Sequence, residues 1–165
     1  MKSIITARMK TAALAGTTTA LLLAGAANVS SDGAADDTDN GRQRELSLAD
    51  EATANLSDTS SEGVRILQGK GRASKRVAAS TTKTLATGQR LIVEAVCLGA
   101  GSVTITTSAG GPPRPRQVRC TESGTDRAKA SRFTFITQRT GPVRVAVQPS
   151  GKTRGGLAFR VRTQT

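Results

Sequence analysis

The chain of 165 residues contains no histidine, no tryptophan and no tyrosine, and it has only three phenylalanines. Without histidine, a Ser-His-Asp or Cys-His mechanism is excluded within this chain, and so is a His-ligated metal centre. Without Tyr and Trp, it lacks the aromatic platforms on which sugar-binding modules usually lay pyranose rings and single-stranded nucleic-acid binders stack bases. Any contact with nucleic acid would depend on phosphate charge, so we expect no sequence-specific binding of nucleic acid. We also expect no metal and no cofactor.

Acidic residues are also scarce beyond residue 62. Residues 63–165 carry nineteen Lys or Arg against only Glu94, Glu122 and Asp126. Acid–base catalysis by paired carboxylates would have to use these three groups. Glu122 and Asp126 lie in a polar stretch where turn chemistry explains them, and Glu94 is expected to face outward on a strand. The sequence therefore argues against an enzyme.

The first 26 residues have the pattern of a secretory signal peptide. Lys2, Arg8 and Lys10 give a positive start, residues 11–26 are moderately apolar, and Ala24 and Ala26 form an A-x-A cleavage pattern. The apolar stretch is shorter than the ~20 residues that a spanning helix needs. Residues 23–25 begin like a bacterial lipobox, but Ala26 stands where the lipidated Cys would be. We therefore expect cleavage near Ala26 and secretion, with no membrane span afterwards.

Residues 27–62 differ in composition from both neighbouring segments. They carry two Arg against nine acidic residues and few large apolar side chains, which is typical of disorder. Ser47 could cap a short helix running through Leu48, Ala52 and Leu56, but an isolated helix of that length is marginal in water. The predicted organisation is therefore a signal peptide at 1–26, an acidic disordered linker at 27–62 and a basic domain at 63–165.

Short runs that alternate apolar and polar residues dominate the basic domain. Because side chains alternate between the two faces of a strand, each run gives one inward set. With weaker candidates at 64–68 and 76–80, the chain is expected to form about eight strands. This pattern predicts an all-β fold, a two-sheet antiparallel β-sandwich. The inward residues are Leu91, Val93, Ala95 and Cys97; Val103, Ile105 and Thr107; Val118 and Cys120; Phe133 and Phe135; Val143, Val145 and Val147; and Leu157, Phe159 and Val161.

Cys97 and Cys120 are the only cysteines. Both fall on predicted inward faces, and an even number of cysteines in an exported chain favours a disulfide. Such a bridge would stabilise the fold by on the order of 3 kcal/mol in the chain-entropy model. The alternatives are a redox pair, for which the C-x-x-C spacing is missing, and a zinc site, for which two thiols without histidine are too few ligands.

Arginine recurs at outward positions of the predicted strands. If these strands share a sheet, their guanidinium groups form a stripe suited to bidentate binding of carboxylate or phosphate. Alternatively, the arginines only cover the solvent face with their aliphatic stems. The acidic residues of 32–62 could lie over this stripe and weaken competing anions. The candidates are Arg119, Arg132, Arg144, Arg160 and Arg162.

The segment 110–116 is rich in glycine and proline and carries two further candidates, Arg114 and Arg116. Its prolines favour polyproline II, so it could present an exposed basic tip for recognition. The alternative is an ordinary long hairpin connection.

The runs LIVEAVCLGAGSVTITT, VRC, FTFITQRTGPVRVAVQPSG and GLAFRV together form a recognisable pattern. It resembles small exported or lipid-anchored proteins of high-GC Gram-positive bacteria (actinobacteria), over residues 64–165. The resemblance implies a β-sandwich with a bridge between Cys97 and Cys120, and little about activity.

These observations predict an exported, non-enzymatic binding or structural module. Its partner would be an anionic polymer of the cell envelope or an acidic protein, held by the exposed arginines. The alternative is a secreted protein-binding factor, an inhibitor or an accessory of a surface system, that uses segment 110–116. Anion binding should weaken steeply with salt, whereas a contact made by a loop in a pocket should persist.

Overall fold

The computed structural model describes residues 39–57, 63–124 and 130–164. The predicted signal peptide and residues 27–38 and 58–62 of the predicted linker lie outside this part. Among the described residues, no helix combines the length and apolarity needed to cross a membrane. The elements are one helix, α1 (Asp39–Ser57), and six strands: β1 (Val64–Arg72), β2 (Val77–Ser80), β3 (Arg90–Ala109), β4 (Arg114–Arg119), β5 (Ser131–Ile136) and β6 (Val143–Thr163).

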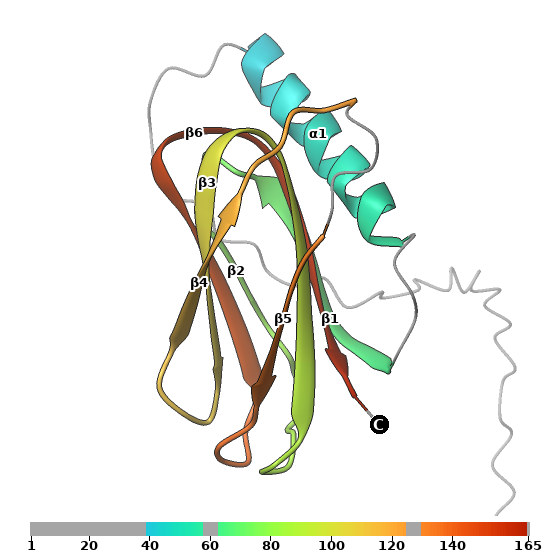
Figure 1. Ribbon diagram of the computed structural model, residues 1–165, viewed down its shortest axis with the longest axis vertical. Coiled ribbons are helices and arrows are strands. Elements are labelled where there is room, and N and C mark those ends of the chain that lie inside the picture. Colours follow the sequence, from blue (N-terminus) through green and yellow to red (C-terminus); the bar gives the residue numbers. More distant parts are fainter. Residues whose placement is uncertain (1–38, 58–62, 125–129, 165) are drawn as a thin grey trace, which may run out of the picture.

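All the strands join in one antiparallel sheet, whose central strands β6 and β3 are each about 20 residues long. They pair with each other from Leu91↔Thr163 to Ala109↔Val143, with an irregularity between Ala100 and Ser102. Both curve over at the end of the molecule where α1 begins (Figure 1). The bend places two halves of the same sheet face to face, so a two-layer sandwich forms from a continuous sheet.

The two halves have different outer strands. In the first, β5 flanks residues 90–95 of β3, and β1 flanks residues 156–163 of β6. In the second, β4 flanks residues 102–107 of β3, and β2 flanks residues 144–147 of β6. We call the first the covered half, because α1 packs on β6, β3 and β1 there, and the second the open half.

The predicted fold class is confirmed, with six strands in place of about eight. Each long strand contains two of the predicted short runs, because the chain bends at glycines without leaving the sheet. Gly99 and Gly155, at the bend, have φ values of 123° and 141°, which side chains with a Cβ rarely adopt. A Cβ on Gly155 would also lie 1.9 Å from the carbonyl oxygen of Leu98.

The predicted inward residues lie between the two halves. The predicted inward side chains are buried, apart from the partly buried Phe133, which packs against this core. Cys97 and Cys120 form a disulfide inside the core, with an S–S distance of 2.03 Å. The bridge joins the covered half to the residue that follows β4, as the pairing of the two cysteines predicted.

Helix α1 contradicts part of the predicted disordered linker. Its buried residues Glu45, Ala49, Ala52 and Leu56 recur at helical spacing and form one face. Ala52 and Leu56 pack on Val96, Leu98 and Ala158, a second apolar cluster on the outer face of the covered half. The helix also begins at Asp39, eight residues before the cap expected at Ser47. It forms because the sheet supplies the apolar partner that an isolated helix would lack.

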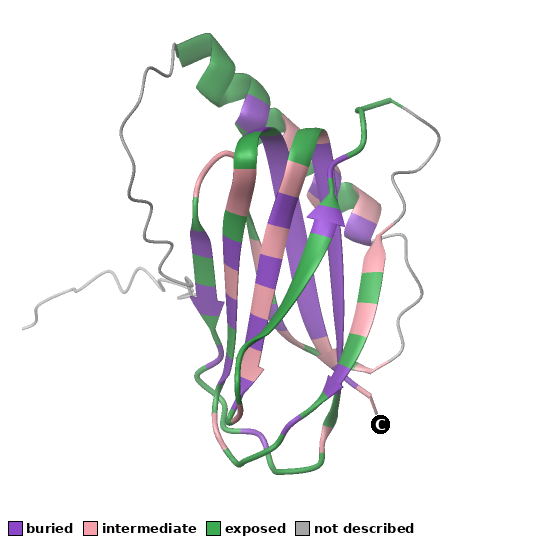
Figure 2. Cartoon of the chain, turned by 60° about the vertical axis from the view of Figure 1, so that its left-hand side comes forward, coloured by how far each residue is buried: buried purple, intermediate pink, exposed green. Residues whose placement is uncertain are grey.

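A glycine allows α1 to lie directly on the sheet. A Cβ on Gly156 would lie 2.0 Å from the backbone nitrogen of Ala49. Figure 2 shows the result: buried residues run without interruption along the strands behind, whereas buried and more exposed residues alternate along the front strands.

Candidate anion-binding surface

The structure separates the predicted arginine stripe into two groups. Arg132, Arg160 and Arg162 lie on the outer face of the covered half, near one another across β5, β3 and β6. Arg114, Arg116, Arg119 and Arg144 belong to the open half. The seven candidates therefore do not form one surface.

The covered-half group surrounds a buried carboxylate. Glu94 pairs in register with Arg132 on one side and Arg160 on the other. The Nε of Arg160 donates a hydrogen bond of 2.6 Å to Glu94 Oε2, and the Nε of Arg162 lies 3.7 Å from the same oxygen. Glu94 and Arg160 are only 3% and 5% exposed.

Glu94 does face away from the core, as expected, but the outer face is buried here. Arg160, expected to be exposed, is therefore a buried partner of Glu94. An ion pair of this kind is costly to leave incomplete, because either charge alone would lie in a poorly solvated site. The arrangement accounts for Glu94 and Arg160 structurally, and it removes Arg160 from the exposed candidates.

The open-half group is exposed and lies around an edge strand. β4 pairs only with β3, so its other side is unpaired within the described sheet. Arg114 and Arg116 point to the side of Val118 and Arg119 to the opposite side, and all three side chains are exposed. Same-side residues of a strand are about 7 Å apart, so Arg114 and Arg116 form a regular pair of cations.

Arg144 lies on β6, two strands from β4, opposite Ser108 of β3. Two strand spacings amount to about 10 Å. Among the described residues, no hydrogen bond or ion pair holds the guanidinium of Arg114, Arg116, Arg119 or Arg144. We call these four residues the basic edge. Its guanidiniums retain their donors for an external anion.

Carboxylates are few around the basic edge. In the described part of the chain, they occur in α1, at Glu94 and at Glu122. The sequence suggested that the acidic residues of 32–62 lie over the arginine stripe, but Asp50 and Glu45 of α1 are placed beside other cations. Asp50 pairs with Lys70 on β1, and Glu45 lies near Arg72, with 3.8 Å between Oε2 and Nε.

Segment 110–116 is a hairpin connection between β3 and β4 that packs against the loop before β6. A Cβ on Gly110 would lie 2.5 Å from the carbonyl oxygen of Arg139, and Gln138 donates a backbone hydrogen bond to Ala109. Pro112 and Pro113 are exposed at its tip. Its two arginines belong to β4 itself, which joins this predicted candidate to Arg119.

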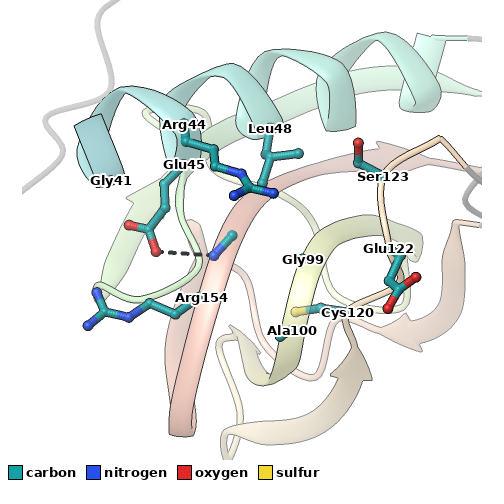
Figure 3. Close-up of a pocket in the computed structure, with 11 residues that line it drawn as sticks. Gly41, Arg44, Glu45, Leu48, Gly99, Ala100, Cys120, Glu122, Ser123 and Arg154 are labelled. Carbon is teal, nitrogen blue, oxygen red and sulfur yellow. Dashed lines mark hydrogen bonds between the residues drawn. The ribbon is translucent and has the colours of Figure 1, made fainter. Parts of the chain in front are cut away.

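Sequence reasoning missed a pocket between α1 and the bend of the sheet (Figure 3). It has a volume of about 820 Å³. Glu45 closes one side: its Oε1 accepts a hydrogen bond of 3.1 Å from the backbone N–H of Gly155, and its Oε2 one of 2.6 Å from Ser74 Oγ. The lining residues are Gly41, Arg44, Glu45, Leu48, Gly99, Ala100, Cys120, Glu122, Ser123, Arg154 and Gly155.

No protein-family model matches this chain. No curated protein matches it either. Among solved structures it is similar to PliG, a periplasmic inhibitor of g-type lysozyme from Aeromonas hydrophila, at 12% identity and a TM-score of 0.40, covering 65% of this chain and 92% of that one. It is also similar to the carbohydrate-binding module CBM36 in complex with calcium and xylotriose, at 13% identity and a TM-score of 0.37, covering 63% and 100%. At these identities the likeness is one of fold only.

Proposed function

We propose that this protein is an exported, non-enzymatic binding module that holds an anionic polymer along its basic edge. The observation that carries the proposal is the set of four exposed arginines, Arg114, Arg116, Arg119 and Arg144, with no carboxylate partner among the described residues. Several exposed guanidiniums on neighbouring strands suit a ligand that repeats its phosphate or carboxylate groups.

The scarcity of catalytic groups supports a binding role. The chain has no histidine, and Glu94 is held by Arg160 inside the protein. Glu122 is exposed, and the other carboxylate that lines the same pocket, Glu45, is buried and accepts hydrogen bonds from Gly155 and Ser74. A hydrolytic reaction with two carboxylates would need both groups beside the substrate.

Export is supported by two features of the chain. The disulfide between Cys97 and Cys120 lies in the core, and such bridges persist in oxidising compartments. The pattern of the first 26 residues is that of a cleavable signal peptide. An exported basic module would meet the anionic polymers of a cell envelope.

The test is binding of the mature protein to sodium polyphosphate and dextran sulfate at increasing salt. If three arginines engage the polymer, its affinity should fall roughly 18-fold between 50 and 200 mM salt, since each contact contributes about 0.7 to the logarithmic slope. The triple variant Arg114→Gln, Arg116→Gln and Arg119→Gln should lose at least about tenfold in affinity, because it removes charge-assisted donors.

A matched control removes the same charge elsewhere. Arg42, Arg65 and Arg76 are exposed and lie on α1, on β1 and before β2, none of which pairs with β4, so their change to Gln should alter affinity less than about twofold. Equal losses in both triple variants would overturn the basic edge in favour of undirected attraction by net charge. Binding of an acidic protein that persists at high salt and is lost on altering Pro112 and Pro113 would favour the protein-binding alternative.

A further inference from the structure

The pocket beneath α1 has a second pocket next to it, beside β4. The second has a volume of about 580 Å³ and is lined by Gly101, Ser102, Gln117, Arg119 and Cys120. Cys120 lines both, and residues 99 and 100 of the first are followed directly along β3 by residues 101 and 102 of the second. We call the two together the bend groove, because they follow the bend of β3.

The groove begins where the basic edge ends. Arg119 is the last residue of β4 and lines the second pocket. Arg119 therefore belongs to both the basic edge and the groove, and a polymer held at Arg119 can enter the groove. At its far end, Arg44 extends from α1 over the first pocket (Figure 3). No described residue forms a hydrogen bond or ion pair with Arg44.

The groove differs chemically from the basic edge. Its lining adds hydroxyl and amide groups, from Ser102, Ser123 and Gln117, to the cations Arg44, Arg119 and Arg154. It also includes the carboxylates of Glu122 and of Glu45, the latter held by Gly155 N–H and Ser74 Oγ. Polyphosphate offers only negatively charged acceptor oxygens to a carboxylate, whereas a ligand with hydroxyl groups could donate hydrogen bonds to it.

From these groups we propose that the bend groove binds a segment of an acidic sugar chain, in which carboxylate groups alternate with free hydroxyls. The inference rests on the proposed function and assigns its ligand class. The lining contains no aromatic side chain, so recognition depends on hydrogen bonds and charge rather than on stacking of a sugar ring. Pockets of this size hold small organic ligands, so the groove can take a few sugar units.

The test compares three probes by calorimetry: a short oligogalacturonate, the same oligomer methyl-esterified to remove its charge, and polyphosphate. The oligogalacturonate should bind more tightly than either of the others. Arg44→Gln should weaken its binding about tenfold, through loss of a charge-assisted hydrogen bond. Arg42→Gln is the matched control, because Arg42 is exposed on the same helix but does not line the groove, and it should leave affinity unchanged.

A second variant tests recognition of the hydroxyl groups. Gln117→Ala keeps every charge, so it should lower the affinity for oligogalacturonate severalfold and leave that for polyphosphate unchanged. If oligogalacturonate binding depends on the arginines of β4 but neither on Arg44 nor on Gln117, the groove is wrong and the proposed function stands. If polyphosphate binds more tightly and also depends on Arg44, the ligand class is wrong. If no anionic probe binds, both proposals fail.

Discussion

The covered and open halves of the sheet are built from the same two long strands, yet the residues on their outer faces differ in burial. In the covered half, residues 91–98 of β3 are all buried, on both faces. In the open half, residues 102–109 alternate between buried and half-buried. The difference comes from α1, whose apolar face packs only on the covered half. One strand can therefore belong to two environments, and its sequence changes pattern at the bend.

The same division decides what an outward arginine does. In the covered half, Arg160 is buried and donates to Glu94. In the open half, Arg144 has an equivalent outward place on the same strand and is exposed, with no described carboxylate beside it. An outward arginine thus stabilises the fold in one half and is available to a ligand in the other.

The strongest test of this contrast removes the buried carboxylate. Glu94→Gln should lower the free energy of unfolding by about 4 kcal/mol, because it leaves Arg160 buried without its counter-charge. Urea denaturation measures the loss. The exposed pair between Asp50 and Lys70 is the control: Asp50→Asn should cost less than about 1 kcal/mol. Similar losses in the two variants would mean that Glu94 is solvated.

A smaller effect is expected from the apolar contact beneath α1. Leu98 is 1% exposed and packs on the outer face of the covered half. Leu98→Ala should cost about 3 kcal/mol, through lost burial and a cavity, and should speed amide exchange in α1. Thr106 is the outward counterpart in the open half, and Thr106→Ala should change stability by less than about 0.5 kcal/mol. Unchanged exchange in α1 would contradict the assignment of Leu98 to its docking.

The smallest of these effects concerns the polar contact at the start of α1. The two carboxylate oxygens of Glu45 accept hydrogen bonds from Gly155 N–H and from Ser74 Oγ. Glu45→Gln replaces one of these acceptors with an amide donor and removes the negative charge near Arg72. We expect a loss of about 2 kcal/mol, together with weaker protection of the first turns of α1. Glu51→Gln on the same helix is the control, and it should cost much less because Glu51 is only half-buried. Equal losses would contradict a specific role for Glu45.

The inward residues of the sheet could be predicted because strand alternation is a strong pattern. Both Val103–Ile105 and Val143–Val147 repeat every second residue, and the core confirms them. The number of strands could not be predicted, because the glycines of the bend, such as Gly99 and Gly155, resemble turn residues. In the structure they bend a continuous strand.

The helix was harder to predict, and so was the burial of the polar residues on the sheet face that it covers. The buried face of α1 is narrow and contains the small residues Ala49 and Ala52, so its apolar periodicity is weak. One signal was present in the covered half: the run Leu91-Ile92-Val93 and Ala95-Val96-Cys97-Leu98 is apolar at nearly every position, as is usual for a strand buried on both faces. That run could have indicated a covering element, and hence the burial of Glu94 and Arg160. The bend groove depends on α1 and was therefore not predictable from the strands alone.

The position of β6 has a consequence for how the chain acquires its structure. β6 is the final strand in the sequence, yet it pairs with β1, β2 and β3. As the chain emerges N-terminus first, β1 and β2 have no neighbour in the sheet until residues 143–163 arrive. Such distant pairings make folding slow, since a long loop must close before they form. β1 and β2 would thus stay without a paired neighbour until β6 has been made, a state well suited to threading through a narrow channel.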